Sequence, residues 1–122
     1  MRFFRDGHGR DWCLNLDAPA LNRVKQSAGV DLRDLHAGDV PPCFRTFVSL
    51  MQVLWAILGP QAKREKVSVC EFEWMLIDRE SDARSKALIA VASSALLWEV
   101  AGLLPADEQI PFVEKIAEAG IR

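Results

Sequence analysis

The sequence predicts a mainly α fold of the α+β class, with an N-terminal β-hairpin packed on a bundle of about five helices. Two observations predict the hairpin: apolar and polar residues alternate around Trp12, and a glycine-containing turn precedes them. A third predicts the bundle, because the rest of the chain repeats apolar residues at helical spacing between capping residues. At 122 residues, we expect a single domain over 1–122, with the hairpin at 1–16 and the helices at 17–122.

The expected hairpin is defined by its turn and its second strand. Trp12 and Leu14 alternate with polar positions, which is the period of two of a half-buried strand. Residues 6–9 supply glycines, which accept the positive φ of a tight turn. Phe3 or Phe4 then faces Trp12 across the hairpin. Because an isolated hairpin is marginal in water, we expect its apolar face to lie on helices or to pair with another chain.

Capping residues predict the first helices. Asp17 is the expected N-cap of the first helix, and Gly29 is its expected end. A second helix, apolar nearly all round, is expected over residues 43–58, with Gly59-Pro60 as its stop signal. Residues 61–66 then predict a further short helical turn.

The second half of the chain predicts three more helices. Ser68 and Glu71 have the spacing of a capping box, in which each side chain satisfies the other residue's exposed amide. A long apolar helix is expected to start at residue 81 or 82 and to run to Leu104. The segment 105–111 is expected to break it, and a last amphipathic helix follows.

The apolar run at residues 87–104 requires a check for a membrane span. It contains a single charged residue, Glu99, and is just long enough to cross a bilayer. A carboxylate near the apolar centre of a span is costly in lipid, and no cluster of cationic or aromatic anchors marks both ends of the run. We therefore expect a helix buried in the protein and no membrane partner. Glu99 either pairs with an arginine or lysine, reaches the surface, or has a raised pKa.

Composition limits the class of partner and the compartment. The formal net charge is −2, which argues against nucleic-acid binding, because that binding depends on Lys and Arg neutralising phosphates. The sequence has three cysteines, an odd number, and no two of them have the C-x-x-C spacing. A disulfide framework is therefore not expected, and a reducing cytoplasm is the expected location.

The sequence offers no recognisable catalytic, cofactor-binding or metal-binding residues. His8 and His36 both lie in glycine-containing turns, where we interpret them as solvated residues. No phosphate-binding loop or nucleophile motif occurs in the sequence. The cysteines lack the close pairing of zinc ligands and stand at Cys13, Cys43 and Cys70. We expect a protein that is not an enzyme and needs no cofactor.

Four tryptophans are the most informative side chains. Trp55 and Trp98 lie in apolar helices and are expected in the core. Trp74 lies off the apolar stripe of its helix, which suits a protein interface. Trp12 faces either the core or a partner. Phe4, Trp12 and Trp74 are therefore the candidate partner-binding residues.

The segment Phe4-Arg5-Asp6-Gly7-His8-Gly9-Arg10-Asp11-Trp12 resembles the F-x-D-x-x-G-R-x-W opening of a group of small phage and prophage tail assembly chaperones. The order of the expected elements after it is also similar. This resemblance implies a cytoplasmic, non-enzymatic protein that binds apolar helices of a tape-measure protein, or another tail protein, and it carries over no catalytic residue.

Two alternatives remain beside this resemblance. The first is a structural or regulatory interaction module, in the form of a homodimer, that contacts its partner through the hairpin edge or a tryptophan patch. The second is a small enzyme or ligand-binding protein built around Glu99 or the histidines, which would need a deep polar pocket.

Overall fold

The computed structural model describes residues 2–6, 9–35, 40–77 and 82–119, and for 75–77, 82–87 and 119 it describes the backbone alone. These residues form an N-terminal antiparallel hairpin and five α-helices, which confirms the predicted mainly α fold. The elements are β1 (Arg2–Arg5), β2 (Asp11–Leu14), α1 (Ala18–Ala28), a 3₁₀ turn η1 (Pro42–Phe44), α2 (Phe47–Arg64), α3 (Val69–Ile77), α4 (Asp82–Ala101) and α5 (Ala106–Ala119).

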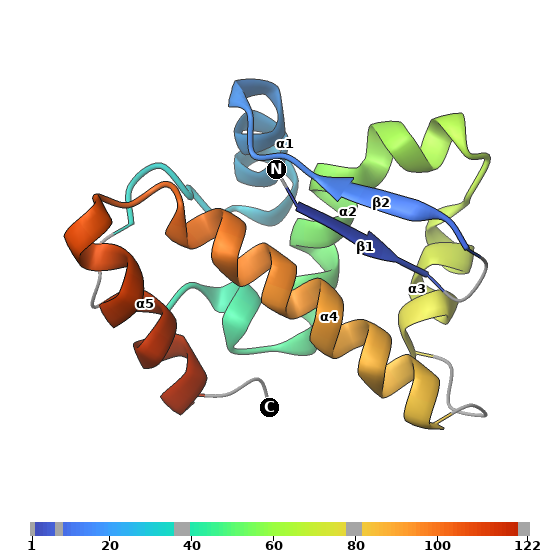
Figure 1. Cartoon of the computed structure of the whole chain (residues 1–122). Helices are drawn as coiled ribbons and strands as arrows, with labels where there is room; N and C mark the ends of the chain where they lie inside the picture. The colour runs from blue at the N-terminus through green and yellow to red at the C-terminus, as the bar shows by residue number, and fades with distance from the viewer. Residues whose placement is uncertain (1, 7–8, 36–39, 78–81, 120–122) are drawn as a thin grey trace.

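The hairpin lies over two helices (Figure 1). Strand β2 contacts α2, strand β1 contacts α4, and α3 contacts both α2 and α4. Helix α1 packs on α2, and α5 packs on α4. One hydrophobic core joins the strands to all five helices of the described residues, so the hairpin's apolar face is buried within the chain itself. Its largest fully buried aromatic side chains are Trp12, Phe44, Phe72 and Phe112.

The strand register decides which phenylalanine faces Trp12. Phe4 is paired with Trp12, and both are buried. Phe3 is paired with Cys13 on the opposite face of the hairpin and is 62% exposed. The predicted alternation of strand β2 is confirmed, since Leu14 is buried with Trp12 while Cys13 is half-buried.

The predicted caps of α1 are confirmed. The Asp17 carboxylate accepts the backbone N–H of Ala20 at 2.9 Å, and Pro19 lies in the first turn, where its missing N–H leaves no helix bond unmade. Gly29 follows the helix at φ 69°, in the left-handed region, and its N–H bonds to the Lys25 carbonyl.

Helix α2 begins later than residue 43, the start predicted from the apolar pattern. The chain first forms η1 after Pro41, with the N–H of Arg45 bonded to the Pro42 carbonyl at 3.0 Å. Thr46 then returns to extended backbone, and its hydroxyl accepts the Ser49 N–H at 3.2 Å as an N-cap. The apolar pattern continues through both elements, so it concealed this boundary.

Helix α2 also passes through Gly59-Pro60, where the sequence predicted its end, and continues to Arg64. Pro60 has no N–H to give to the Ala56 carbonyl four residues earlier. Arg23 of α1 replaces the missing donor, since its Nε donates to the Ala56 carbonyl oxygen at 2.8 Å and its Nη2 to that of Ile57 at 3.2 Å. A side chain from another helix therefore lets the proline remain inside α2, and residues 61–64 belong to this helix.

The expected capping box of α3 is present in a modified form. The Ser68 hydroxyl accepts the Glu71 N–H at 3.1 Å, as predicted. The reciprocal bond differs, because the Glu71 carboxylate accepts the Ser68 hydroxyl at 3.3 Å. The two side chains therefore bond to each other as well as to the backbone.

The break between α4 and α5 is shorter than the predicted 105–111. Helix α4 ends at Ala101, before Leu104, and α5 already starts at Ala106. The Gln109 side chain donates to the Leu104 carbonyl at 3.1 Å, which fixes the connection. Pro111 lies inside α5, where it leaves the carbonyl of Asp107, an exposed residue, without its helix donor.

Helix α4 carries the acid singled out in the apolar run. Glu99 lies 3.8 Å from the Arg2 guanidinium, which realises the pairing alternative. Trp98, expected in the core, is 36% exposed, and the same guanidinium lies 5.7 Å from its ring centroid. Among the described residues, no helix combines the length and apolarity needed to cross a membrane.

Candidate protein-binding site

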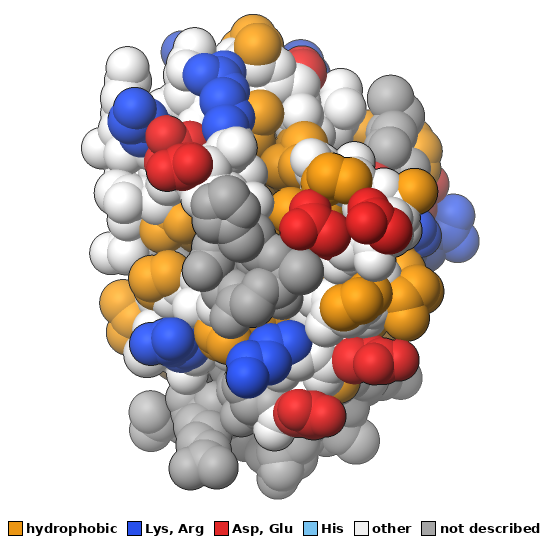
Figure 2. Space-filling view, turned by 90° about the vertical axis from the view of Figure 1, so that its left-hand side faces the viewer, with side chains coloured by type: hydrophobic (Ala, Val, Ile, Leu, Met, Phe, Trp, Pro, Cys, Tyr) orange, Lys and Arg blue, Asp and Glu red, His pale blue; other side chains and the backbone are white. Residues whose placement is uncertain are grey.

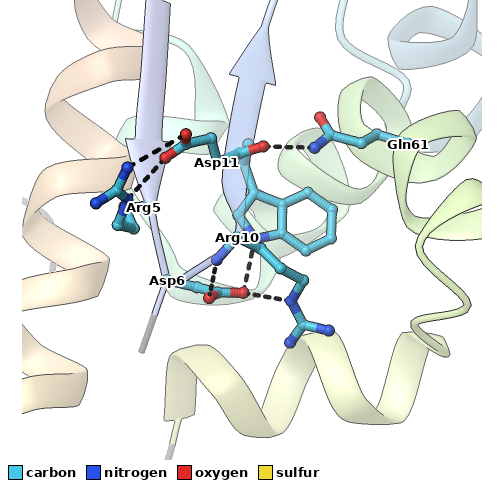
Figure 3. A network of polar contacts seen from close by, with 6 residues as sticks. Arg5, Asp6, Arg10, Asp11 and Gln61 are labelled. Atoms are coloured by element: carbon cyan, nitrogen blue, oxygen red, sulfur yellow. Dashed lines mark hydrogen bonds and ion pairs between the residues drawn. The ribbon is translucent and has the colours of Figure 1, made fainter. Parts of the chain in front are cut away.

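The conspicuous motif of the sequence forms a buried polar clasp (Figure 3). The Asp6 side chain is fully buried and accepts hydrogen bonds from two described residues, Arg10 and Trp12. The backbone N–H and the Nε of Arg10 donate at 3.0 and 2.7 Å, and the Trp12 indole N–H donates at 3.0 Å. Gly9 supplies the turn between them at φ 79°. The motif residues therefore hold the hairpin together, and their chemistry is structural.

The clasp connects to a second feature through Trp12. With its N–H held by Asp6, the Trp12 ring packs edge-on against Phe72 of α3, with centroids 5.6 Å apart. Phe72 also packs against Trp55 of α2 at 5.3 Å. The hairpin thereby positions the aromatic side chains where α2 and α3 meet.

An apolar groove lies at this junction, with a volume of about 330 Å³. We call it the α2–α3 groove. It is lined by Phe47, Val48, Met51, Gln52, Trp55, Val69, Phe72 and Glu73. Val48 is 67% exposed and Val69 is 42% exposed, so the apolar walls reach the surface. An exposed apolar surface of this kind is a candidate binding surface, since removing apolar area from water is favourable.

The charge of the groove is acidic. Glu73 is the charged residue among those that line it, and Glu71 is exposed on the same helix. A partner with an apolar stripe beside lysine or arginine therefore complements this groove in both polarity and charge.

The three candidate contact residues lie in different environments. Phe4 and Trp12 are core residues, 3% and 0% exposed, because the hairpin presses this face against the helices. Neither side chain is accessible to a partner in this structure. Trp74 is 67% exposed on α3, beside the groove residue Glu73 in sequence but not in the groove lining.

Sequence reasoning missed the groove residues of α2. The pattern of residues 43–58 predicts burial on all sides, whereas Val48 is exposed and Trp55 is half-buried. Thr46 could have indicated where α2 begins, because an N-cap at this position places Val48 in the first turn of the helix. Which face α3 leaves open depends on tertiary packing.

A second apolar surface lies between β1 and α4. Phe3, Val91 and Trp98 are 62%, 49% and 36% exposed there. They border a cleft of about 530 Å³, which Arg2 also lines. This cleft shares no lining residue with the α2–α3 groove.

The face that carries α5 has a mixed surface (Figure 2). Hydrophobic side chains of the described residues are interspersed there with acidic and basic ones. Ile110 of α5 is 55% exposed. Scattered apolar residues of this kind are ordinary for a protein surface, so the groove and the cleft are the stronger candidates.

The residues considered for chemistry are the histidines and the cysteines. His8 and His36 lie outside the described residues. Cys13, Cys43 and Cys70 are free cysteines, and burial raises the pKa of the Cys43 thiol to about 12. Within the part of the chain that the structure describes, no three His, Cys, Asp or Glu residues are grouped to hold a metal ion.

No family model matches the sequence, and no curated protein or solved structure matches it either.

Proposed function

We propose that this protein is a non-enzymatic, phage-derived tail assembly chaperone that binds apolar helices of a tape-measure protein in the cytoplasm of its bacterial host. Two lines of reasoning support the proposal. The Phe4–Trp12 segment resembles the opening of such chaperones. The α2–α3 groove offers a surface of the polarity that an apolar helix requires.

The groove is the observation that carries the proposal. Two helices form its walls, and helix-in-groove recognition places apolar residues at i, i+3, i+4 and i+7 of the bound helix between such walls. Trp55 lines the groove as a half-buried ring that packs on the buried Phe72, and a rigid aromatic side chain of this kind loses little entropy on binding. Glu73 at the groove favours a bound helix with a lysine or arginine beside its apolar stripe.

Co-expression tests the proposal. The chain is produced with the tape-measure protein of the phage or prophage that encodes it, and we expect co-purification and a gain in soluble tape-measure protein. Val48→Asp places a charge in the groove and is expected to weaken binding at least tenfold. Val91→Asp is the matched control, because it makes the same change at another exposed valine, which lies in the cleft and not in the groove. Absence of both co-purification and a gain in solubility would refute the proposal.

The second candidate function is an interaction module that forms a homodimer. Trp74 favours it, because a tryptophan that is 67% exposed is the type of side chain that dominates interface energetics. Light scattering at increasing concentration distinguishes the two functions. A dimer that Trp74→Ala converts to a monomer supports the module, and a strict monomer excludes it.

A further inference from the structure

The C-terminal end of α2 carries a cluster of exposed cations. Lys63, Arg64 and Lys66 are all exposed, and within the described residues no ion pair engages any of the three. Glu65 lies among them and offsets one of their charges. We call these three cations the α2 cationic end. Their remaining charge is available to a partner.

Lys66 has a backbone conformation that glycine normally provides. Its φ is 58°, in the left-handed region. Its N–H bonds to the Lys63 carbonyl at 3.3 Å and the Val67 N–H bonds to the Ala62 carbonyl at 2.8 Å, which are the two bonds of a Schellman motif at the end of α2. The Cβ of a lysine is unfavourable at this position, so the local backbone gives no reason for the residue. An outlier of this kind directs attention to what its side chain binds.

The α2 cationic end continues the α2–α3 groove. Gly59 and Lys63 follow the groove residue Trp55 at steps of four residues, which places them on the same side of α2. At the rise of an α-helix, Lys63 lies about 12 Å beyond Trp55 along α2. The helix surface between them is open, because a Cβ at Gly59 would meet no neighbouring atom within 4 Å. On the other wall, Lys66 precedes the groove residue Val69 by three positions. Both walls of the groove therefore lead to cations.

We propose that the groove and the α2 cationic end form one continuous site, which binds a helix whose apolar stripe is followed, about two turns further along, by acidic side chains. This inference rests on the function proposed above and names the partner of the same groove more closely. Two helical turns span about 11 Å, which is close to the separation of Trp55 and Lys63 along α2. Apolar residues of the bound helix pack on Val48 and Trp55, and its carboxylates pair with Lys63 and Lys66.

The charge of this site changes along its length. Glu73 lines the groove and favours a lysine or arginine beside the apolar stripe, whereas the α2 cationic end favours carboxylates beyond it. From Val48 to Lys63 the site extends over about 22 Å of α2, which a bound helix of about 15 residues covers. The charge pattern therefore selects helices whose charge changes sign along their length, and it fixes where along the groove they bind.

Two other anionic partners fit this site less well. A nucleic acid would bring phosphates against Glu73 in the groove and Glu65 at its end, and the chain carries a net charge of −2. An extended acidic peptide would meet the lysines, but its side chains alternate at a period of two and do not form the stripe that fits between two helix walls. We therefore expect the acidic part of the partner to be helical and joined to an apolar stripe.

Three helical peptides of about 20 residues test the inference. They share one apolar stripe with a lysine beside it, and two turns beyond the stripe they carry glutamates, glutamines or lysines. By fluorescence anisotropy at low salt, we expect the glutamate peptide to bind about fivefold tighter than the glutamine peptide, and the lysine peptide about fivefold weaker. Lys63→Glu/Lys66→Glu is expected to reverse this order. Lys25→Glu/Lys115→Glu changes the net charge equally at exposed lysines that do not line the groove, and it is expected to preserve the order.

Lys66→Gly separates the effect on binding from the effect on folding. Glycine accepts the left-handed backbone, so we expect the midpoint of urea unfolding to stay or to rise while affinity for the glutamate peptide falls about twofold. An unchanged affinity in this stably folded variant would contradict the role of the Lys66 side chain.

The outcomes separate this inference from the function proposed above. If the three peptides bind alike, or if Lys63→Glu/Lys66→Glu leaves their order intact, the inference is wrong and the groove remains a site for apolar helices. If the glutamate peptide keeps its affinity in Val48→Asp, or if a DNA oligonucleotide displaces it, charge alone drives its binding and the inference is equally wrong. If no peptide binds, the groove is not a site for helices, which overturns both the inference and the observation that carries the proposed function.

Discussion

Arg23→Ala tests why α2 continues through Pro60. The substitution removes the donors to the carbonyl oxygens of Ala56 and Ile57, at 2.8 and 3.2 Å. The Ala56 carbonyl has no helix donor, because Pro60 lacks an N–H. A hydrogen bond that involves a charged group contributes about 1.5–3 kcal/mol, so we expect the free energy of unfolding to fall by about 2 kcal/mol.

The same substitution is expected to cost less when residue 60 can donate. In Pro60→Ala, the new backbone N–H bonds to the Ala56 carbonyl, and Arg23→Ala then removes only the weaker bond and some packing. We expect a cost of about 1 kcal/mol in this background, and hence a coupling of about 1 kcal/mol between the two positions.

Urea unfolding of the four proteins of this cycle, followed by tryptophan fluorescence and far-UV circular dichroism, measures the coupling. Arg33→Ala is the control, because this exposed arginine donates to the Ala18 carbonyl at 3.2 Å but satisfies no proline-freed group. If the two substitutions are additive within about 0.5 kcal/mol, the reasoning about Arg23 is refuted.

Three further predictions concern the hairpin and the cysteines. Asp6→Asn removes the buried charge that pairs with Arg10 and gives Trp12 Nε1 a poorer partner, so we expect the free energy of unfolding in urea to fall by about 2–4 kcal/mol. Asp11→Asn, at an exposed pair, is expected to have a much smaller effect, and equal effects of the two substitutions would contradict the burial of Asp6. The hydrogen bond from Arg5 and its charge lower the pKa of Asp11, so NMR titration should give a midpoint below the ordinary value that rises in Arg5→Gln. The small stability this pair adds is present above the unfolded-state pKa of Asp11 and lost as pH falls through the folded-state value. Cys43 is buried, and burial raises the pKa of its thiol to about 12. At pH 8 a thiol reagent should therefore label the exposed Cys70 at once and Cys43 only at the rate of unfolding. Rapid labelling of Cys43 in the folded Cys13→Ser/Cys70→Ser variant would contradict its burial.

The sequence predicted elements whose signals are local. Asp17 and Gly29 mark the ends of α1 because an N-cap carboxylate and a left-handed glycine act within one turn of the backbone. The turn at Gly9 and the alternation at Trp12 predicted the hairpin for the same reason. Fold class and the existence of the helices followed from such patterns.

The candidate site was less accessible to the same reasoning. The motif directed attention to Phe4 and Trp12, which are buried because they build the hairpin. No sequence motif marks the groove residues Val48 and Val69 as exposed, because their exposure depends on how α2 and α3 pack together. Of the candidate contact residues, Trp74 is exposed, as its position off the apolar stripe of its helix suggested.

By itself, the sequence determined the hairpin, the helical content and the near-neutral charge, because each depends on neighbouring residues or on composition. Only the tertiary structure decided that α2 passes through Pro60, since the donor that permits it, Arg23, lies 33 residues from Ala56 in the sequence. The same holds for the outer edge of β2, where the Gln61 side chain of α2 accepts the Cys13 N–H although the two residues are 48 positions apart. Side chains that satisfy distant backbone groups leave no periodic signal in the sequence, so only the folded chain reveals them.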